Sequence, residues 1–377
     1  MVFKSTPRVA VSAMFALNGL LFGMWAGRVP GFVEALALEP ADLTLVFLSM
    51  AAGAIVSFPL AGWASDSLGA ARTVRIVAVC YALTAPLLAT AGSLGALAAL
   101  ALLFGAGHGA MDVAMNAWGA EVERAARRPI MAAFHAMWSL GAGLGAGSGF
   151  LAVKAGLAPL EHFALGALWA AAGALWLARL PWQSQITARG AGFALPPRAL
   201  LLVGVLAMGS SIGEGAMADW SAVFLIEVAS ASQASAALGF GVFSAAMVVA
   251  RLGADGLVRL IGPVATARLG GALAAAGLVV ALIGGTLATG LAGFALVGFG
   301  YAALIPLAFS RAANQQGVAP GRAIAGVATL GYGGMLLGPV VVGGVAHLTS
   351  LPMAFALLAL LAALIIGAAG ALRPAAG

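Results

Sequence analysis

The sequence has 377 residues, of which 63% are hydrophobic and only 8% are charged. Soluble globular domains carry about 25% charged residues, so this composition excludes an ordinary soluble protein and indicates a polytopic membrane protein. The net charge of +6 is compatible with binding to nucleic acid or another anionic partner, but the positions of the basic residues give a simpler explanation.

Apolar stretches long enough to cross a bilayer follow one another along the whole chain. A crossing helix needs about 20 apolar residues. The first stretch is longer than the apolar core of a secretory signal, so we expect it to be retained as a helix over 8–28. Further helices are predicted over 42–62, 73–92, 94–118, 130–153, 159–180, 199–226, 235–254, 264–286, 290–313, 322–346 and 352–372, which makes twelve.

The basic residues test this number of helices. With twelve crossings, both termini and every loop after an even-numbered helix lie on one side of the membrane. All of the 18 Lys and Arg residues except Arg28 and Lys154 then fall on that side. Such a bias marks the cytoplasmic side. We therefore predict a bacterial inner-membrane protein with both termini cytoplasmic, and no nucleic-acid binding.

The chain divides near its middle. The longest polar connection, Pro181 to Arg198, separates residues 1–180 from residues 199–377. The loops that contain Asp66 and Asp255 are similar, and these aspartates are 189 residues apart, about half the chain. We expect an all-α membrane protein of two six-helix bundles, 1–180 and 199–377, joined by a cytoplasmic linker over 181–198 and related by a parallel repeat.

The loop between the second and third predicted helices carries a motif, Gly62-x-x-x-Asp66-x-x-Gly69-x-x-Arg72. It resembles the signature of the major facilitator superfamily at the same place, with a degenerate copy at Asp255. The resemblance implies that family's fold and a cytoplasmic gate. Physically, the glycines permit close helix approach, the Asp66 carboxylate suits the N-terminus of a helix in the other bundle, and Arg72 can pair with Asp66.

Four further stretches resemble one branch of this superfamily: Asn18 to Pro30, Met111 to Glu123, Arg128 to Gly141, and Glu214 to Leu225. They are similar to the bacterial YbjJ-like branch, which is distantly similar to proton-coupled sugar symporters and includes a named carrier of an amino-inositol, rhizopine. This resemblance implies a sugar, polyol or amino-sugar-like solute.

Polar side chains on the fourth and fifth predicted helices form the first candidate site. His108, Asp112 and Asn116 are spaced four residues apart and share one helix face. A carboxylate inside a bilayer is costly unless it faces protein or water. We expect this face, with His135 and Trp138 from the returning helix, to line a solute pathway; the alternative for Asp112 is a structural pairing with His108 or Arg128.

Glu214, between two glycines of the seventh predicted helix, is the second candidate carboxylate. Asp219 lies about 140° further round the helix and joins it only if the helix kinks. Glu214 and Asp112 are the candidates for proton coupling, because burial disfavours the charged form of a carboxylate. Further candidate lining residues are Asn18, Trp25, Arg28, Trp220, Tyr301, Thr329 and Tyr332. In the cavity, Arg28 would meet a hydroxyl, a carboxylate or Asp112; membrane anchoring is the alternative for Trp25, Arg28 and Trp220.

The sequence predicts a monomeric secondary transporter that moves a small polar solute across the bilayer by alternating access, with protons as the coupling ion. The alternative within the class is a proton-coupled exporter of drugs or metabolites, because the glycine-rich stretch Gly141 to Phe150 resembles the antiporter motif, although without its proline. An enzyme would need a nucleophile or metal constellation, which the sequence lacks, and a sensor would need an output domain. We expect no cofactor and no metal.

Overall fold

The computed structural model describes residues 6–38, 40–186, 197–231, 233–236 and 238–374, and these residues are almost entirely helical. Within these described ranges, eleven helices are long and apolar enough to cross a membrane. The helices are α1 (Pro7–Leu36), α2 (Pro40–Leu68), α3 (Ala70–Leu88), α4 (Leu94–Ala126), α5 (Met131–Lys154), α6 (Pro159–Ala178), α7 (Leu201–Ala229), α8 (Gln233–Ala236), α9 (Leu238–Gly284), α10 (Leu287–Tyr301), α11 (Leu304–Ala313), α12 (Pro320–Leu348) and α13 (Leu351–Ala368).

Several helix starts are fixed by hydroxyl side chains. Thr6, Ser93, Thr286 and Ser350 stand at the N-cap positions of α1, α4, α10 and α13, and each side-chain oxygen accepts from a backbone N–H three residues later. Such a cap satisfies a donor that the first helical turn leaves unbonded. The ends of these helices are therefore encoded locally, independently of packing.

The structure differs from the predicted helix series in the second half of the chain. The element α9 covers the predicted helices 235–254 and 264–286 and breaks between them, at Gly262 (φ 80°, ψ 165°) directly before Pro263, so a sharp kink separates the two predicted helices. Glycine adopts this backbone conformation without the clash that a Cβ would bring. The predicted helix 290–313 is divided instead, into α10 and α11, at Ala302 and Ala303.

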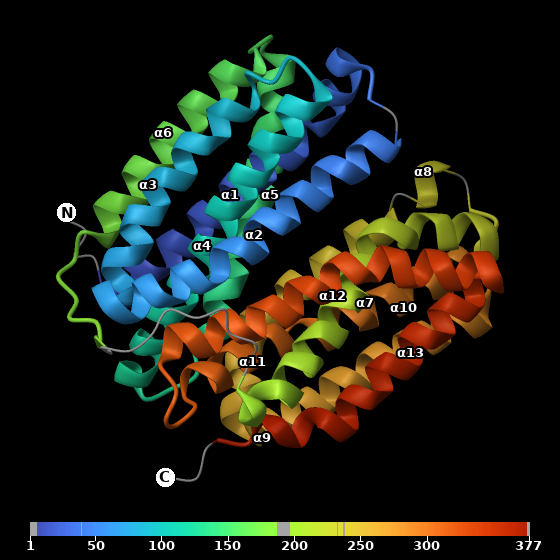
Figure 1. Cartoon of the computed structure of the whole chain (residues 1–377). Helices are drawn as coiled ribbons and strands as arrows, with labels where there is room; N and C mark the ends of the chain where they lie inside the picture. The colour runs from blue at the N-terminus through green and yellow to red at the C-terminus, as the bar shows by residue number, and fades with distance from the viewer. Residues whose placement is uncertain (1–5, 39, 187–196, 232, 237, 375–377) are drawn as a thin grey trace. The chain divides into compact units, whose positions relative to one another are not determined.

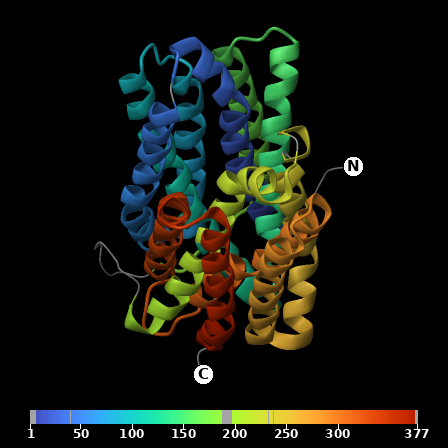
Figure 2. The same cartoon turned by 90° about the vertical axis from the view of Figure 1, so that its right-hand side faces the viewer.

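The chain forms two compact units. Unit 1 consists of residues 1–127, 134–194 and 317–325, and unit 2 of residues 128–133, 195–316 and 326–377. In unit 1, α4 packs along α2 and α3, and α6 packs along α1 and α3; Figure 1 and Figure 2 show these helices, coloured from dark blue to green, running along one another. In unit 2, α9 packs along α10 and α13, and α7 packs against α13 and α11.

Glycines make the contact between α1 and α5 very close. A Cβ added to Gly19 would overlap the carbonyl oxygen of Trp138, and one added to Gly23 would overlap that of Ala142. From the other side, a Cβ at Gly141 would overlap the carbonyl oxygen of Ala16. Small residues let membrane helices approach in this way. In the stretch that resembles the antiporter motif, Gly141 therefore has a packing role.

Candidate functional site

In unit 1, the predicted polar face of α4 meets α5 through three side chains. The Asn116 amide nitrogen donates to the backbone oxygen of Asp112 (2.8 Å) and to its carboxylate oxygen Oδ1 (3.2 Å). This fixes the amide so that Asn116 Oδ1 faces His135 Nε2 at 3.1 Å. Because an amide oxygen only accepts, His135 Nε2 carries the hydrogen. Asn116 thus connects the buried Asp112 to the buried His135.

His108 lies on the same helix among aromatic rings. The Tyr81 hydroxyl is 3.3 Å from His108 Nδ1, and the rings of Phe22 and Trp138 lie 5.2 Å and 6.4 Å from the His108 ring. His108 and Asp112 are both buried. The structure therefore brings His108, Asp112, Asn116, His135 and Trp138 into unit 1 together, on α4 and α5.

Two predicted lining residues of α1 are buried in the interior of unit 1. Asn18 is fully buried, and its amide nitrogen contacts the Met115 sulfur at 3.5 Å. Trp25 is 2% exposed and packs against Phe32 and Phe104, with ring centroids 5.2 Å and 6.5 Å apart. Trp25 is therefore a core residue in this structure, and it is neither an interfacial anchor nor an exposed stacking surface.

Arg28 is also buried, and its partners are on α6 and the turn before it. Its Nη2 donates to the carbonyl of Leu157, and its Nε donates to His162 Nδ1 at 3.4 Å. His162 Nε2 lies 3.0 Å from the Ser148 hydroxyl, which donates to the carbonyl of Gly145. Arg28 is therefore neither a water-exposed membrane anchor nor a partner of Asp112, which were the two roles expected from the sequence. It ties α1 to α5 and α6.

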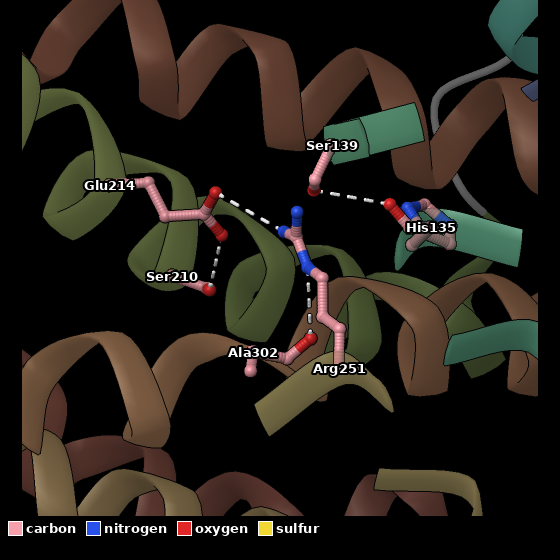
Figure 3. Close-up of polar contacts among 6 residues, drawn as sticks. All are labelled: His135, Ser139, Ser210, Glu214, Arg251 and Ala302. Carbon is pink, nitrogen blue, oxygen red and sulfur yellow. Dashed lines mark hydrogen bonds and ion pairs between the residues drawn. The ribbon is translucent and has the colours of Figure 1, made fainter. Parts of the chain in front are cut away.

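In unit 2, Glu214 of α7 forms an ion pair with Arg251 of α9 (Figure 3). Glu214 Oε2 lies 3.6 Å from Arg251 Nη2, and the Ser210 hydroxyl donates to Glu214 Oε1 at 3.4 Å. The Arg251 side chain is 7% exposed and that of Glu214 is 24% exposed. A Cβ at Gly213 would overlap the ring of the buried Tyr301, so glycine is required beside the carboxylate.

The other contact of Arg251 explains how it is oriented. Its Nε donates to the carbonyl of Ala302 at 3.4 Å, at the break between α10 and α11 (Figure 3). In a continuous helix this carbonyl would accept from residue 306, but Pro306 has no N–H to donate. The Ala302 carbonyl, which lacks a helical donor because of Pro306, thus accepts from Arg251 Nε. Glu214 faces Arg251 Nη2.

Arg251 is a site residue that the sequence analysis missed. It was counted among the cytoplasmic loop charges, although it lies inside the predicted helix 235–254. In the structure Arg251 is buried within α9. A signal was available: a buried Glu214 needs a cation, and Arg251 is the only basic residue within that predicted helix.

Other predicted site residues of unit 2 lie on α7 and α12. The helix α7 runs unbroken past Asp219, which is exposed on another face, so the kink that would have brought Asp219 beside Glu214 is absent. Trp220 packs over Gly343, where a Cβ would lie 3.2 Å from its ring. Thr329 and Tyr332 are half-buried on α12.

The two motif aspartates cap helices. Asp66 Oδ1 and Oδ2 accept from the backbone N–H groups of Gly321 (2.8 Å) and Arg322 (3.0 Å), in the first turn of α12. Gly62 supports this contact, since its Cβ position is 3.0 Å from the Gly321 carbonyl. Arg72, in contrast, is exposed and, among the described residues, forms no ion pair with Asp66, so that predicted pairing is wrong.

Asp255 caps the first turn of α5 in the same way. Its Oδ1 and Oδ2 accept from the backbone N–H groups of Ala132 (3.0 Å) and Ala133 (2.8 Å), in the first turn of α5. Both the aspartates and the helix turns they cap are separated by 189 residues. The degenerate copy of the motif has therefore kept the capping contact although it lost the rest of the pattern.

Glu121, near the end of α4, is a second residue whose role the sequence did not reveal. Its carboxylate accepts from Trp182 Nε1 (2.6 Å), the Ser184 hydroxyl (2.9 Å) and the Gln185 backbone N–H (3.1 Å). Ser184 also accepts from the backbone N–H of Ala71 at 3.1 Å. The start of the predicted linker is thus fixed to the turn between α2 and α3.

No group of three or more His, Cys, Asp or Glu side chains that could hold a metal ion is found in the part of the chain that the structure describes.

Comparisons with known proteins agree with this architecture. The family model of the Major Facilitator Superfamily matches residues 11–318. The chain is 42% identical to the uncharacterized transporter y4wD of Sinorhizobium fredii, over 96% of each chain. It is 31% identical to the membrane protein MosC of Rhizobium meliloti, over 92% of this chain and 86% of MosC.

Solved structures show the same fold at low sequence identity. The human organic anion transporter MFSD10 superposes with a TM-score of 0.80 at 19% identity, covering 97% of this chain and 100% of that one. The proton:xylose symporter XylE superposes with a TM-score of 0.73 at 15% identity, covering 95% of this chain and 94% of that one. With the family match over most of its length, the chain belongs to the major facilitator superfamily of membrane transporters.

Proposed function

We propose that this transporter moves a small polar solute across the bacterial inner membrane by alternating access, coupled to protons through Glu214. The observation that carries the proposal is the Glu214–Arg251 ion pair, since a guanidinium stays protonated and Glu214 is therefore the partner that can gain and lose a proton. A carboxylate that is largely enclosed yet 24% exposed can exchange a proton with water.

The wider assignment rests on the sequence. The YbjJ-like resemblance favours a sugar, polyol or amino-sugar skeleton, and a symporter for xylose is among the structural neighbours, although at 15% identity that likeness concerns the fold alone. The distribution of basic residues supports cytoplasmic termini. We propose a monomer in which Asp66 and Asp255 hold the caps of α12 and α5 in one of the alternating states and release them in the other.

Reconstituted proteoliposomes test the coupling. A pH-sensitive dye inside the vesicles should report proton entry when sugars, polyols, amino-sugars or organic acids are supplied under an imposed pH gradient. We expect Glu214→Gln to lose gradient-driven accumulation while it keeps solute exchange. Glu227→Gln, at an exposed position on the same helix, is the matched control.

Asp112→Asn separates the two candidate carboxylates. With Glu214 as the coupling group, this variant should weaken solute binding through Asn116 and His135 and still respond to the pH gradient. If Glu214→Gln accumulates solute against its gradient and Asp112→Asn does not, the coupling group is Asp112. If both variants accumulate solute, neither carboxylate is the coupling group.

A further inference from the structure

Arg251 places a permanent positive charge inside unit 2. A guanidinium stays protonated at any physiological pH, and a buried one needs an anion beside it. Arg251 is 6% exposed, and Glu214 is the carboxylate that lies against it. The charge state of Glu214 therefore changes how much negative charge faces Arg251.

The geometry of the pair is loose. Charge-assisted N–H···O hydrogen bonds are usually about 2.7–2.9 Å long, whereas Arg251 Nη2 and Glu214 Oε2 are 3.6 Å apart. The bond from Arg251 Nε to the Ala302 carbonyl is 3.4 Å long. The Arg251 guanidinium thus donates to the Ala302 backbone carbonyl through Nε. The distance from its Nη2 to Glu214 is longer than a usual hydrogen bond.

We propose that the transported solute carries a carboxylate, which pairs with Arg251 when Glu214 takes up a proton. This rests on the proposed function and adds the chemical class of the solute, a sugar-like skeleton bearing an acid group. The proton goes to a carboxylate oxygen of Glu214, and no covalent bond of the solute is made or broken. The planar carboxylate of the solute replaces the planar carboxylate of Glu214, a geometry that the guanidinium fork matches.

Charge balance favours this class over a neutral sugar. With Glu214 ionised, the pair has no net charge; with Glu214 protonated and a monocarboxylate bound, the site again has none. A neutral solute arriving with a proton would leave Arg251 facing an uncharged Glu214, and an amino-sugar cation would add a second positive charge. Removing one partner of a buried ion pair is strongly unfavourable.

Binding to the purified full-length protein tests the solute class. The probes are D-glucuronate and D-gluconate, with acetate as the smallest carboxylate, compared with D-glucose and D-glucosamine by thermal unfolding. Glu214→Gln imitates the protonated state and should bind the carboxylates at least tenfold more tightly than the parent at pH 8. The difference should shrink as the pH is lowered, because Glu214 of the parent then takes up a proton as well.

Matched variants assign the binding to Arg251. Arg251→Gln should abolish carboxylate binding, whereas Arg259→Gln, exposed on the same helix, should not change it. If Arg251→Gln does not fold, the double variant E214Q/R251Q removes both charges and serves instead. The proposal is overturned if no carboxylate stabilises Glu214→Gln more than the parent, or if D-glucose or D-glucosamine binds in preference.

Transport by proteoliposomes then separates this inference from the proposed function. Symport of one proton with one monocarboxylate is electroneutral, so uptake should follow a pH gradient and ignore a potassium–valinomycin potential. Uptake that ignores the pH gradient contradicts the proposed coupling itself. Uptake that follows both the pH gradient and the potential leaves proton coupling intact and overturns the carboxylate proposal.

Discussion

Two buried arginines in this protein illustrate how partners determine a role. Arg28 donates to a carbonyl and to a histidine nitrogen, both neutral groups that belong to packed helix ends. Arg251 faces Glu214, whose charge can change. The first arrangement is suited to holding helices together, and the second to responding to a proton.

Replacing Arg28 should therefore affect stability rather than solute selectivity. Arg28→Gln leaves the Leu157 carbonyl and His162 Nδ1 without their donor, at a cost of about 1–3 kcal/mol. We expect a lower melting temperature in detergent and unchanged relative affinities for the solute panel. Arg8→Gln, exposed at the start of the same helix, is the control. A selective loss of affinity for one solute class would instead place Arg28 in the binding site.

The sequence identified which residues are polar within the membrane but not what they contact. Spacing along one helix correctly grouped His108, Asp112 and Asn116, because helix geometry fixes which side chains share a face. Contacts between helices, such as those of Arg28 and Arg251, depend on crossing angles and breaks that spacing does not encode. Pro306 is an example. The sequence shows that this proline leaves the Ala302 carbonyl without its helical N–H donor, but it does not show that Arg251 donates to that carbonyl instead.

At the scale of elements, the close contact of α1 with α5 depends on glycines at particular positions. Gly23 faces the Ala142 carbonyl without room for a Cβ, whereas Gly31 on the same helix has no atom within 4 Å of its Cβ position. The same substitution should therefore act in opposite directions at the two sites.

Gly23→Ala should destabilise the protein by about 1–3 kcal/mol, because the added methyl group forces α1 and α5 apart. Gly31→Ala should be neutral or stabilising by up to about 1 kcal/mol, since alanine favours the helix more than glycine does. Thermal unfolding of both variants under one set of conditions provides the comparison. Equal melting temperatures would show that α1 and α5 adjust to the extra volume.

The contact of Glu121 with residues 182–185 predicts how the linker is held. Glu121→Ala removes the acceptor for three donors, so the segment 181–185 should leave the turn between α2 and α3. Limited proteolysis between residues 181 and 198 should become several-fold faster. Gln183→Ala, exposed in the same segment, should leave the rate unchanged. An unchanged rate in Glu121→Ala would mean that other contacts hold the linker.

For the whole molecule, composition was sufficient to predict a helical membrane protein, because apolar length and basic-residue bias are dominated by the bilayer. The major facilitator fold was predicted from the resemblance of the motif over residues 62–72, and the family match confirms it. The break of α9 at Gly262 lies between the predicted helices 235–254 and 264–286. The division of α10 from α11 was not predicted, since glycine and proline are tolerated inside membrane helices as well as between them. The two-bundle division at 181–198 remains a prediction.

The capping aspartates give a prediction at this scale. Asp66→Asn weakens the interaction with the first turn of α12 by about 0.5–2 kcal/mol, which changes a two-state population several-fold. We expect the states in which that turn is released to be more populated. In a Cys80→Ser background, a reporter cysteine at the buried Ser65 should react faster with maleimide in Asp66→Asn than in its parent. Equal rates would argue against a gating role.

The Asp66 cap also has a consequence for biosynthesis. Its partner, Gly321, lies 255 residues further along the chain, which a ribosome adding about 5–20 residues per second needs roughly 13–50 s to reach. During that interval the Asp66 carboxylate is without the helix turn that it binds in the finished protein. A nascent chain stalled before residue 320 should therefore expose a cysteine at position 65 to maleimide, and one stalled well beyond α12 should protect it. The Asp66 contact at the end of α2 can thus form only after the first turn of α12 has been synthesised.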